Sequence, residues 1–263
     1  MGRRGLRSYF SWRALWHLQF MPRTVALFEH PLALLKNYIG LGSETRDYRT
    51  RAGQYFSNVL PVETESIIGS FVKHEYGDID VDGDVIDIGA NIGAFSLYAA
   101  WRPKTKRVLA FEPMHDTFRR LMGNVTASVA SERISFIHSA VGSRSGFVEM
   151  ILGDNSMLHR SSEVNEKATD SDTAAPVVSL ASVFDFYDIK NCALLKIDCE
   201  GAEYGILENL PPVYFQRIYA IRMEIHPRLD GRTTEDLFRF IESQGFTVEK
   251  RLHYGIIWFR RAN

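Results

Sequence analysis

A glycine-rich turn and two acidic residues near it offer the first chemistry in this sequence. The apolar run 85–88 contains Asp87 and leads through Gly89, Asn91 and Gly93 into a helical pattern. Glycine lets the backbone approach a ligand closely, and a helix N-terminus presents free N–H groups. About twenty residues further on, a second apolar run ends at Glu112, where a carboxylate can accept hydrogen bonds from ribose hydroxyls. This spacing predicts a site for a nucleoside-bearing cofactor.

The detail of the turn indicates which cofactor. A dinucleotide-binding turn needs glycines in the spacing G-x-G-x-x-G, whereas this chain has Asn91 in the middle and Ala94 at the third position. The carboxylate of Asp87 disfavours a pyrophosphate beside the turn and favours a ligand with positive charge. S-adenosylmethionine carries an ammonium and a sulfonium, so we expect this cofactor rather than NAD. A strand–turn–helix that binds no ligand is the alternative, and the spacing of Glu112 argues against it.

Asp198 and His226 are the candidates for acid–base chemistry. Each stands at the end of an apolar run that resembles a parallel strand. Ligands of open α/β sheets bind beyond the carboxyl ends of the strands, so the two side chains approach each other if their strands are neighbours. A carboxylate or an imidazole can remove a proton from a hydroxyl, with Lys196 or Arg222 shaping the local charge. An ordinary histidine in front of Pro227 is the alternative for His226.

The acids around Asp198 allow a second kind of site. Asp198, Glu200 and Glu203 could together hold Mg²⁺, because oxygen ligands suit this ion. Glu203 could instead only stabilise the start of a helix. Glu224 lies two residues before His226, so the two share a face of their strand. Our prediction for the site contains no metal.

Alternating strand and helix patterns place these residues at one edge of a sheet. Apolar runs separated by helical patterns occur at residues 84–88, 107–111, 134–138, 193–198 and 218–225. This alternation predicts an α/β fold, with a Rossmann-like, doubly wound and mostly parallel sheet of seven strands. We expect residues 246–251 and 255–260 to close it as an antiparallel hairpin. Ser139 and Ala140 follow the third run and should lie at the same edge.

Three stretches of the sequence resemble the FkbM family of methyltransferases. They are residues 87–93 (DIGANIG), 111–113 (FEP) and 195–203 (LKIDCEGAE), and the resemblance covers about residues 60–230. The resemblance implies a class I fold that uses S-adenosylmethionine. It implies that Glu112 binds the ribose and that Ser139 and Ala140 lie beside the adenine. It also implies that the cofactor turn is formed by Asp87, Gly89, Asn91 and Gly93.

These observations predict an S-adenosylmethionine-dependent O-methyltransferase that acts on a hydroxyl of a sugar, glycan or polyketide-like metabolite. A nicotinamide-dependent oxidoreductase is one alternative, and the dinucleotide glycine pattern that it needs is incomplete. A non-catalytic binding protein of the same fold is another. The presence of Asp87, Glu112 and Asp198 together argues against a degenerate site.

Composition narrows the class of protein. The 263 residues carry 31 basic and 32 acidic side chains, and a net charge of −1 argues against a nucleic-acid partner. Cys192 and Cys199 give no disulfide framework, and no apolar stretch approaches the ~20 residues of a membrane span. We therefore expect a cytoplasmic protein with a small-molecule or glycan acceptor.

We expect two parts in the chain. Residues 1–60 should form an N-terminal helical and extended segment, and residues 61–263 the methyltransferase domain. Arginines and aromatic side chains alternate before the first acid, Glu29. We expect this stretch to pack on the domain, with peripheral contact to an anionic membrane surface as the weaker alternative.

Overall fold

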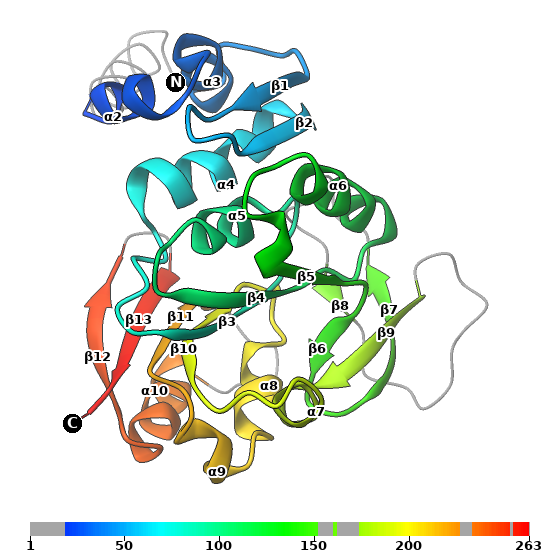
Figure 1. Ribbon diagram of the computed structural model, residues 1–263. Helices are drawn as coiled ribbons and strands as arrows, with labels where there is room; N and C mark the ends of the chain where they lie inside the picture. The colour runs from blue at the N-terminus through cyan, green and yellow to red at the C-terminus, as the bar shows by residue number, and fades with distance from the viewer. Residues whose placement is uncertain (1–18, 152–159, 162–173, 227–232, 253–254, 263) are drawn as a thin grey trace, which may run out of the picture.

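The computed structural model describes residues 19–151, 160–161, 174–226, 233–252 and 255–262. A seven-stranded sheet lies at its centre, in the order β12-β13-β11-β10-β3-β4-β5 (Figure 1). Five neighbouring strands are parallel: β3 (Gly83–Ile88), β4 (Thr105–Phe111), β5 (Ile134–Ile137), β10 (Cys192–Ile197) and β11 (Ala220–Glu224). An antiparallel hairpin completes the sheet beside β11: β12 (Phe246–Arg251) and β13 (Ile256–Arg261). The predicted Rossmann-like sheet and its C-terminal hairpin are confirmed.

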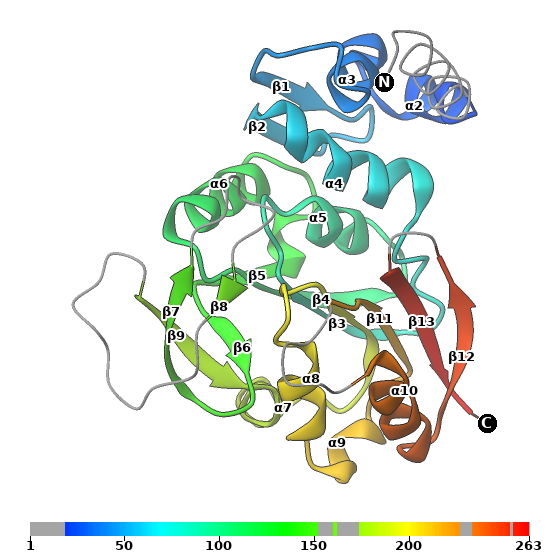
Figure 2. The ribbon, with the colours of Figure 1, turned by 180° about the vertical axis from the view of Figure 1, so that it is seen from behind.

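Helices cover both faces of this sheet (Figures 1 and 2). One face carries α4 (Thr64–Ile68), α5 (Ala94–Ala100) and α6 (His115–Thr126); the other carries α7 (Leu180–Phe186), α8 (Glu203–Glu208), α9 (Pro212–Phe215) and α10 (Thr234–Ser243). Strands β3 and β10 are therefore buried along their whole length, which explains why they appear in the sequence as nearly continuous apolar runs. Three charged residues interrupt these runs, Asp84, Asp87 and Lys196, and the last two lie next to the site.

Helix ends follow their local sequence signals. Thr233 caps α10 by accepting the backbone N–H of Asp236, and the side chain of Asp236 in turn accepts the backbone N–H of Thr233. The helix ends before Gly245, which has a φ of +87°. The helical stretch before β3 changes type along its length: the 3₁₀ turn η1 (Pro61–Glu63) is followed by α4 and then by the π-helical η2 (Gly69–Lys73).

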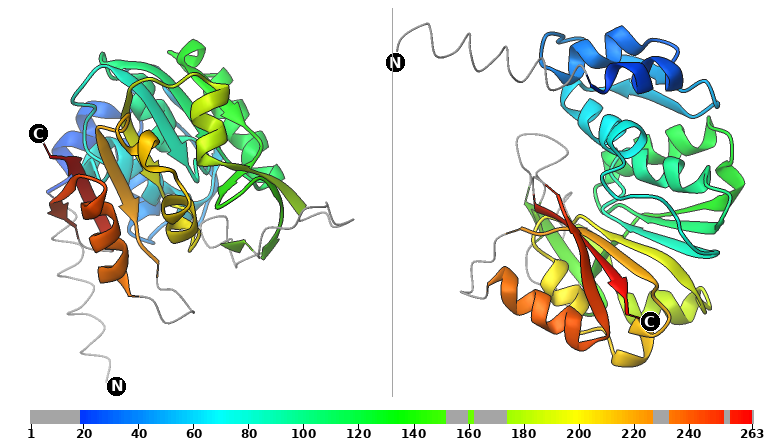
Figure 3. Two further views of the ribbon diagram at one scale, coloured as in Figure 1. Left: turned by 90° about the horizontal axis from the view of Figure 1, so that it is seen from below. Right: turned by 90° about the vertical axis from the view of Figure 1, so that its left-hand side faces the viewer.

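The described N-terminal residues form α2 (Met21–Leu27), α3 (Pro31–Tyr38) and a hairpin of β1 (Arg46–Arg49) and β2 (Tyr55–Val59). Figure 3 shows these elements beyond α4, on the side of the sheet that carries α5. The backbone N–H of Ser57 donates to Asn124 Oδ1 at 2.9 Å, which ties β2 to α6. The division of the chain into a segment of residues 1–60 and a methyltransferase domain of residues 61–263 stays a prediction. The arginine-rich residues 1–18 lie outside the described chain.

A second, four-stranded sheet flanks the first. Its order is β6-β9-β7-β8, formed by β6 (Ala140–Gly142), β7 (Gly146–Ile151), β8 (Arg160–Ser161) and β9 (Ala174–Ser179). Strands as short as β6 carry no readable alternation of apolar residues, which is why the sequence did not show this sheet. Among the described residues, no helix combines the length and apolar character needed to cross a membrane.

Candidate functional site

A pocket of about 370 Å³ lies at the carboxyl ends of the central strands. Its lining includes six of the predicted site residues: Gly89, Asn91, Glu112, Ser139, Ala140 and Asp198. The described residues that line it do not include Asp87, Gly93 or His226. The structure thus brings most of the predicted site together at the sheet edge where the alternation of strands and helices placed it.

The turn after β3 has no room for side chains at its glycines. A Cβ on Gly89, where φ is +77°, would lie 1.7 Å from the carbonyl oxygen of Asp198. Asn91 also has a positive φ of 50°, a conformation that asparagine adopts more readily than most residues. Gly93 precedes α5, and a Cβ there would lie 2.6 Å from Leu121 Cδ1. Gly93 therefore allows α5 to pack closely on α6, and Gly93 itself does not line the pocket.

Glu112 presents a fixed carboxyl group to the pocket. The side chain is buried, with 6% of the residue exposed. Its Oε2 accepts the backbone N–H of Asn91 and its Oε1 accepts that of Met114, both at 2.9 Å. Burial raises the pKa of Glu112 to about 7, against the lowering effect of these hydrogen bonds. Each oxygen keeps a second lone pair, so the group can still accept hydroxyl hydrogens from a ligand.

Asp87 supports the turn from behind. It is fully buried, its Oδ2 accepts the hydroxyl of Ser96 at 2.5 Å, and its Oδ1 lies 3.1 Å from Nζ of Lys196. The same ammonium group donates to the carbonyl oxygen of Gly89 at 2.7 Å. The carboxylate of Asp87 points between β3, α5 and β10, and Lys196 is the member of this pair that lines the pocket. A contact between Asp87 and the cofactor stays a prediction.

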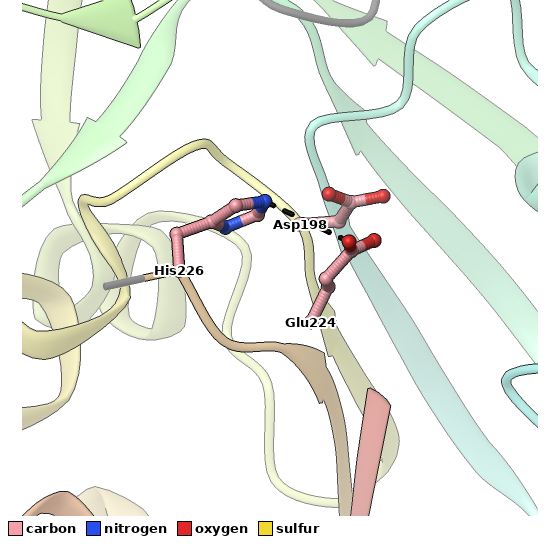
Figure 4. A group of neighbouring side chains, drawn as sticks. All are labelled: Asp198, Glu224 and His226. Atoms are coloured by element: carbon pink, nitrogen blue, oxygen red, sulfur yellow. Dashed lines mark ion pairs between the residues drawn. The ribbon is translucent and has the colours of Figure 1, made fainter. Parts of the chain in front are cut away.

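The predicted acid–base residues lie on neighbouring strands. Strands β10 and β11 pair in parallel, with Ile197 opposite Met223, so Asp198 and Glu224 follow at the same level. An oxygen of each of these acids and a ring nitrogen of His226 all lie within 4.8 Å of one another, as Figure 4 shows. The two-residue spacing in the sequence places Glu224 on the same face of its strand as His226. Our prediction of the site does not include Glu224, and this spacing was the signal that could have added it.

His226 is held by carboxylates. Its Nδ1 lies 2.6 Å from Oε1 of the fully buried Glu203, and its Nε2 lies 3.4 Å from Glu200 and 3.8 Å from Glu224. Burial lowers the pKa of His226, but the hydrogen bond and charge of Glu203, with the charges of the other two acids, raise it to about 9. Burial and the neighbouring Asp198 raise the pKa of Glu224 to about 8. Glu203 therefore does more than stabilise the start of a helix, because it also holds the ring of His226.

The pocket as a whole is acidic. Its described lining contains one lysine, Lys196, no arginine and six carboxyl side chains: Glu65, Glu75, Glu112, Asp198, Glu200 and Glu224. This balance of charge favours a ligand that carries positive charge. Tyr76 also lines the pocket, and its hydroxyl donates to Oδ2 of Asp198 at 2.8 Å. No local pattern in the sequence points to Tyr76, because it is distant from Asp198 along the chain.

Arg222, the second cation expected near the acid–base pair, lies elsewhere. Its guanidinium stacks over the ring of Trp258, with 4.3 Å from Cζ to the ring centroid. Its Nη1 is 2.9 Å from Glu249 Oε2, on the hairpin strand β12. Arg222 therefore joins β11 to the C-terminal hairpin and does not shape the charge of the pocket.

Comparison with known protein families decides what kind of protein this is. A model of the methyltransferase FkbM domain matches residues 87–248, more than half of the chain. The chain belongs to the FkbM methyltransferase family. The resemblance seen in the three sequence stretches is confirmed, and S-adenosylmethionine is the cofactor.

Individual relatives of this FkbM-family protein are distant. AMB antimetabolite synthetase AmbE of Pseudomonas aeruginosa is 27% identical over 206 residues, which are 65% of this chain and 10% of AmbE. The 31-O-demethyl-FK506 methyltransferase FkbM of Streptomyces tacrolimicus is 27% identical over 195 residues, 63% of this chain and 74% of that protein. A crystal structure of methyltransferase FkbM from Methylobacillus flagellatus aligns with a TM-score of 0.44 and 16% identity, over 68% of this chain and 43% of that one.

Proposed function

We propose that this protein transfers the methyl group of S-adenosylmethionine to a hydroxyl of a sugar, glycan or polyketide-like small molecule. One observation carries the proposal: Asn91 and Glu112, which suit the cofactor, line the same pocket as Asp198 and Glu224, which suit the removal of a proton. A nucleoside-bearing methyl donor and the acidic group at the ends of β10 and β11 can therefore act on one acceptor.

The residues present fit S-adenosylmethionine. The tight turn at Gly89 and Asn91 lets a ligand approach the backbone, and Glu112 accepts the ribose hydroxyls in our assignment. Ser139 and Ala140 line the same pocket, and our assignment puts the adenine beside them. The acidic lining compensates the ammonium and sulfonium charges, and once bound the cofactor supplies a methyl group that is already strongly electrophilic.

The protein then has two tasks, which are to align the acceptor and to accept its proton. A bond forms between the acceptor oxygen and the methyl carbon, the bond between carbon and sulfur breaks, and the hydroxyl proton leaves. Asp198 is our choice for the carboxylate that receives this proton, because it faces the pocket and Tyr76 holds its second oxygen. His226, beside it, completes the acid–base pair.

The name of one relative supports oxygen as the methylated atom. The name of the 31-O-demethyl-FK506 methyltransferase, which is 27% identical, places its methyl group on an oxygen. Carboxylate and imidazole groups also suit the removal of a hydroxyl proton, whereas a neutral amine needs no base before it attacks.

The test is transfer of an isotopically labelled methyl group. The purified protein is incubated with methyl-labelled S-adenosylmethionine and a panel of sugars, glycans and hydroxylated polyketides, and products are identified by mass spectrometry. We expect label on an acceptor oxygen together with an equal amount of S-adenosylhomocysteine. Label on nitrogen or carbon would contradict O-methylation. Calorimetry that detects NAD binding but no binding of S-adenosylmethionine would contradict the whole proposal.

A further inference from the structure

Three side chains at the carboxyl ends of β10 and β11 present their donor atoms to one another (Figure 4). A carboxylate oxygen of Asp198, one of Glu224 and a ring nitrogen of His226 lie within 4.8 Å of one another. Around an octahedral ion with bonds of about 2.1 Å, neighbouring donors are about 3 Å apart and opposite donors about 4.2 Å apart. Small rotations of these side chains would bring all three donors to bonding distance of one ion.

The imidazole of His226 is oriented as in a metal site. Its Nδ1 lies 2.6 Å from Oε1 of Glu203, a carboxylate with no exposed surface. This hydrogen bond keeps a proton on Nδ1 and directs Nε2 toward Glu200, 3.4 Å away, and Glu224, 3.8 Å away. Ligating histidines commonly donate their other ring N–H to a carboxylate in this way, which fixes the ring and makes Nε2 a better donor.

Asp198 is oriented by the same kind of contact. The hydroxyl of Tyr76 donates to its Oδ2 at 2.8 Å, and Nζ of Lys196 lies 3.7 Å from that oxygen. Both contacts involve one oxygen, so Oδ1 has neither of these partners. Glu224, level with Asp198 on the adjacent strand, supplies a second carboxylate from the opposite side.

Negative charge exceeds positive charge around Asp198, Glu224 and His226. Asp198 and Glu224 lie beside His226, and Glu200 and Glu203 both contact the imidazole. The nearby ammonium of Lys196 is shared with Asp87. With Nε2 as a ligand the imidazole is neutral, and the cofactor brings a single net positive charge for the whole pocket. A divalent cation would offset two of the remaining negative charges.

We infer that Asp198, Glu224 and His226 bind a divalent metal ion. One imidazole with two carboxylates suits an ion that accepts nitrogen as well as oxygen, so we expect Mn²⁺ or Zn²⁺ to bind more tightly than Mg²⁺. Its role rests on the proposed function: the ion would hold the acceptor oxygen and make its proton easier to remove. This departs from our prediction of a metal-free site, because the sequence could not place Glu224 beside Asp198.

The experiment uses the full chain after dialysis against a chelator. The protein is titrated with Mn²⁺ alone, and free Mn²⁺ is followed by electron paramagnetic resonance. We expect one equivalent of Mn²⁺ to bind, and a large excess of Mg²⁺ to displace it poorly. The variants Glu224→Gln and His226→Ala should lose this binding. Glu203→Gln, which disturbs the orientation of the imidazole but removes no proposed ligand, should weaken it by about 10–100-fold. The matched control is Glu235→Gln, an exposed acid on α10.

S-adenosylhomocysteine binding is measured in the same samples, because it depends on the turn and on Glu112 and reports whether each variant is folded. Protein that binds S-adenosylhomocysteine but neither Mn²⁺ nor Zn²⁺ would overturn the metal site and leave the cofactor assignment intact. Mn²⁺ binding that survives in both Glu224→Gln and His226→Ala would place the ion elsewhere and overturn it as well. Undiminished methyl transfer by the metal-free protein would overturn the role of the ion in the reaction.

Discussion

Nζ of Lys196 lies 3.1 Å from Oδ1 of Asp87, and both side chains are almost completely buried. The same ammonium group donates to the carbonyl oxygen of Gly89 at 2.7 Å. One lysine of β10 therefore fixes the end of β3 and its cofactor turn. Because Asp198 stands two residues after Lys196, directly past the end of β10, this pair also sets the distance between the cofactor turn and the acidic group.

Replacing this lysine should destabilise the protein strongly. Lys196→Met leaves the carboxylate of Asp87 buried without its cation, which typically costs about 3–5 kcal/mol in the free energy of unfolding. The double variant Lys196→Met with Asp87→Asn removes the uncompensated charge and should recover part of this loss. Urea unfolding of the two variants measures both effects. A loss below about 1 kcal/mol in Lys196→Met would contradict the structural role of the pair.

The turn at Gly89 should tolerate no side chain. In Gly89→Ala the added Cβ meets the carbonyl oxygen of Asp198 at 1.7 Å, in a backbone conformation that alanine already disfavours. Strain and steric overlap together predict a loss of about 2–6 kcal/mol and of S-adenosylhomocysteine binding. Gly245→Ala is the matched control, because its φ is also positive but a Cβ there meets nothing within 4 Å. It should cost about 1–2 kcal/mol with unchanged affinity. Equal effects of the two substitutions would argue against a special role for the turn.

The parts of the fold and site that the sequence predicted depend on local patterns. Strands buried on both faces, such as β3 and β10, leave continuous apolar runs, and a strand end marks Glu112 and Asp198. The turn at Gly89 carries its own signal, because a positive φ and a close approach both require glycine.

The parts that the sequence missed depend on contacts between distant residues. Tyr76 and Asp198 are 122 residues apart in the chain, and no pattern around either residue indicates the other. The contact between Asp87 and Lys196 was missed for the same reason, since Lys196 belongs to a strand more than 100 residues away. Glu224 was recognisable only as a neighbour of His226, and its place beside Asp198 follows from the pairing of β10 with β11.

Cofactor affinity should depend on pH through Glu112. Burial raises its pKa to about 7, and its charged neighbours include Lys196 and Asp87. Ribose hydroxyls donate to the ionised carboxylate, so binding favours loss of the proton. Affinity for S-adenosylhomocysteine should therefore rise toward pH 7 and level off above it, with a limiting slope of about tenfold per pH unit below it. Calorimetry between pH 5.5 and 8.5 measures this trend.

The variant Glu112→Gln serves as the control for this trend. It should remove the slope and weaken binding above pH 7 by about 1.5–3 kcal/mol, the range for hydrogen bonds to a charged group. In the free protein, a rise in pH has the opposite effect on stability from its effect on cofactor affinity. The folded state holds the Glu112 proton more tightly than the unfolded state, whose carboxyl has the ordinary pKa of 4.5, so this group's contribution to stability falls between about pH 4.5 and 7. A slope that persists in Glu112→Gln would assign the titration to another group.

Turnover should depend on Asp198 far more than cofactor binding does. Asp198→Asn keeps the size of the side chain but removes its charge, and loss of a general base typically lowers kcat by about 10²–10⁴-fold. A role of Asp198 as a metal ligand predicts a loss in the same direction. Affinity for S-adenosylhomocysteine should stay close to that of the unmodified protein, because the turn and Glu112 are untouched. Steady-state kinetics and calorimetry on the same preparation separate the two quantities.

Tyr76→Phe tests whether turnover depends on the orientation of the Asp198 carboxylate. The substitution removes only the hydroxyl that donates to Asp198 Oδ2 at 2.8 Å, and the aromatic ring can keep its edge-on packing against Phe95. A hydrogen bond to a charged group is worth about 1.5–3 kcal/mol, so kcat should fall by about 10–100-fold, less than in Asp198→Asn. In the double variant the loss should match that of Asp198→Asn alone, because Tyr76 acts through Asp198. Losses that multiply would show that the tyrosine contacts the acceptor directly. Near-normal turnover in both folded single variants would remove Asp198 from the reaction and leave positioning of the two substrates as the source of catalysis.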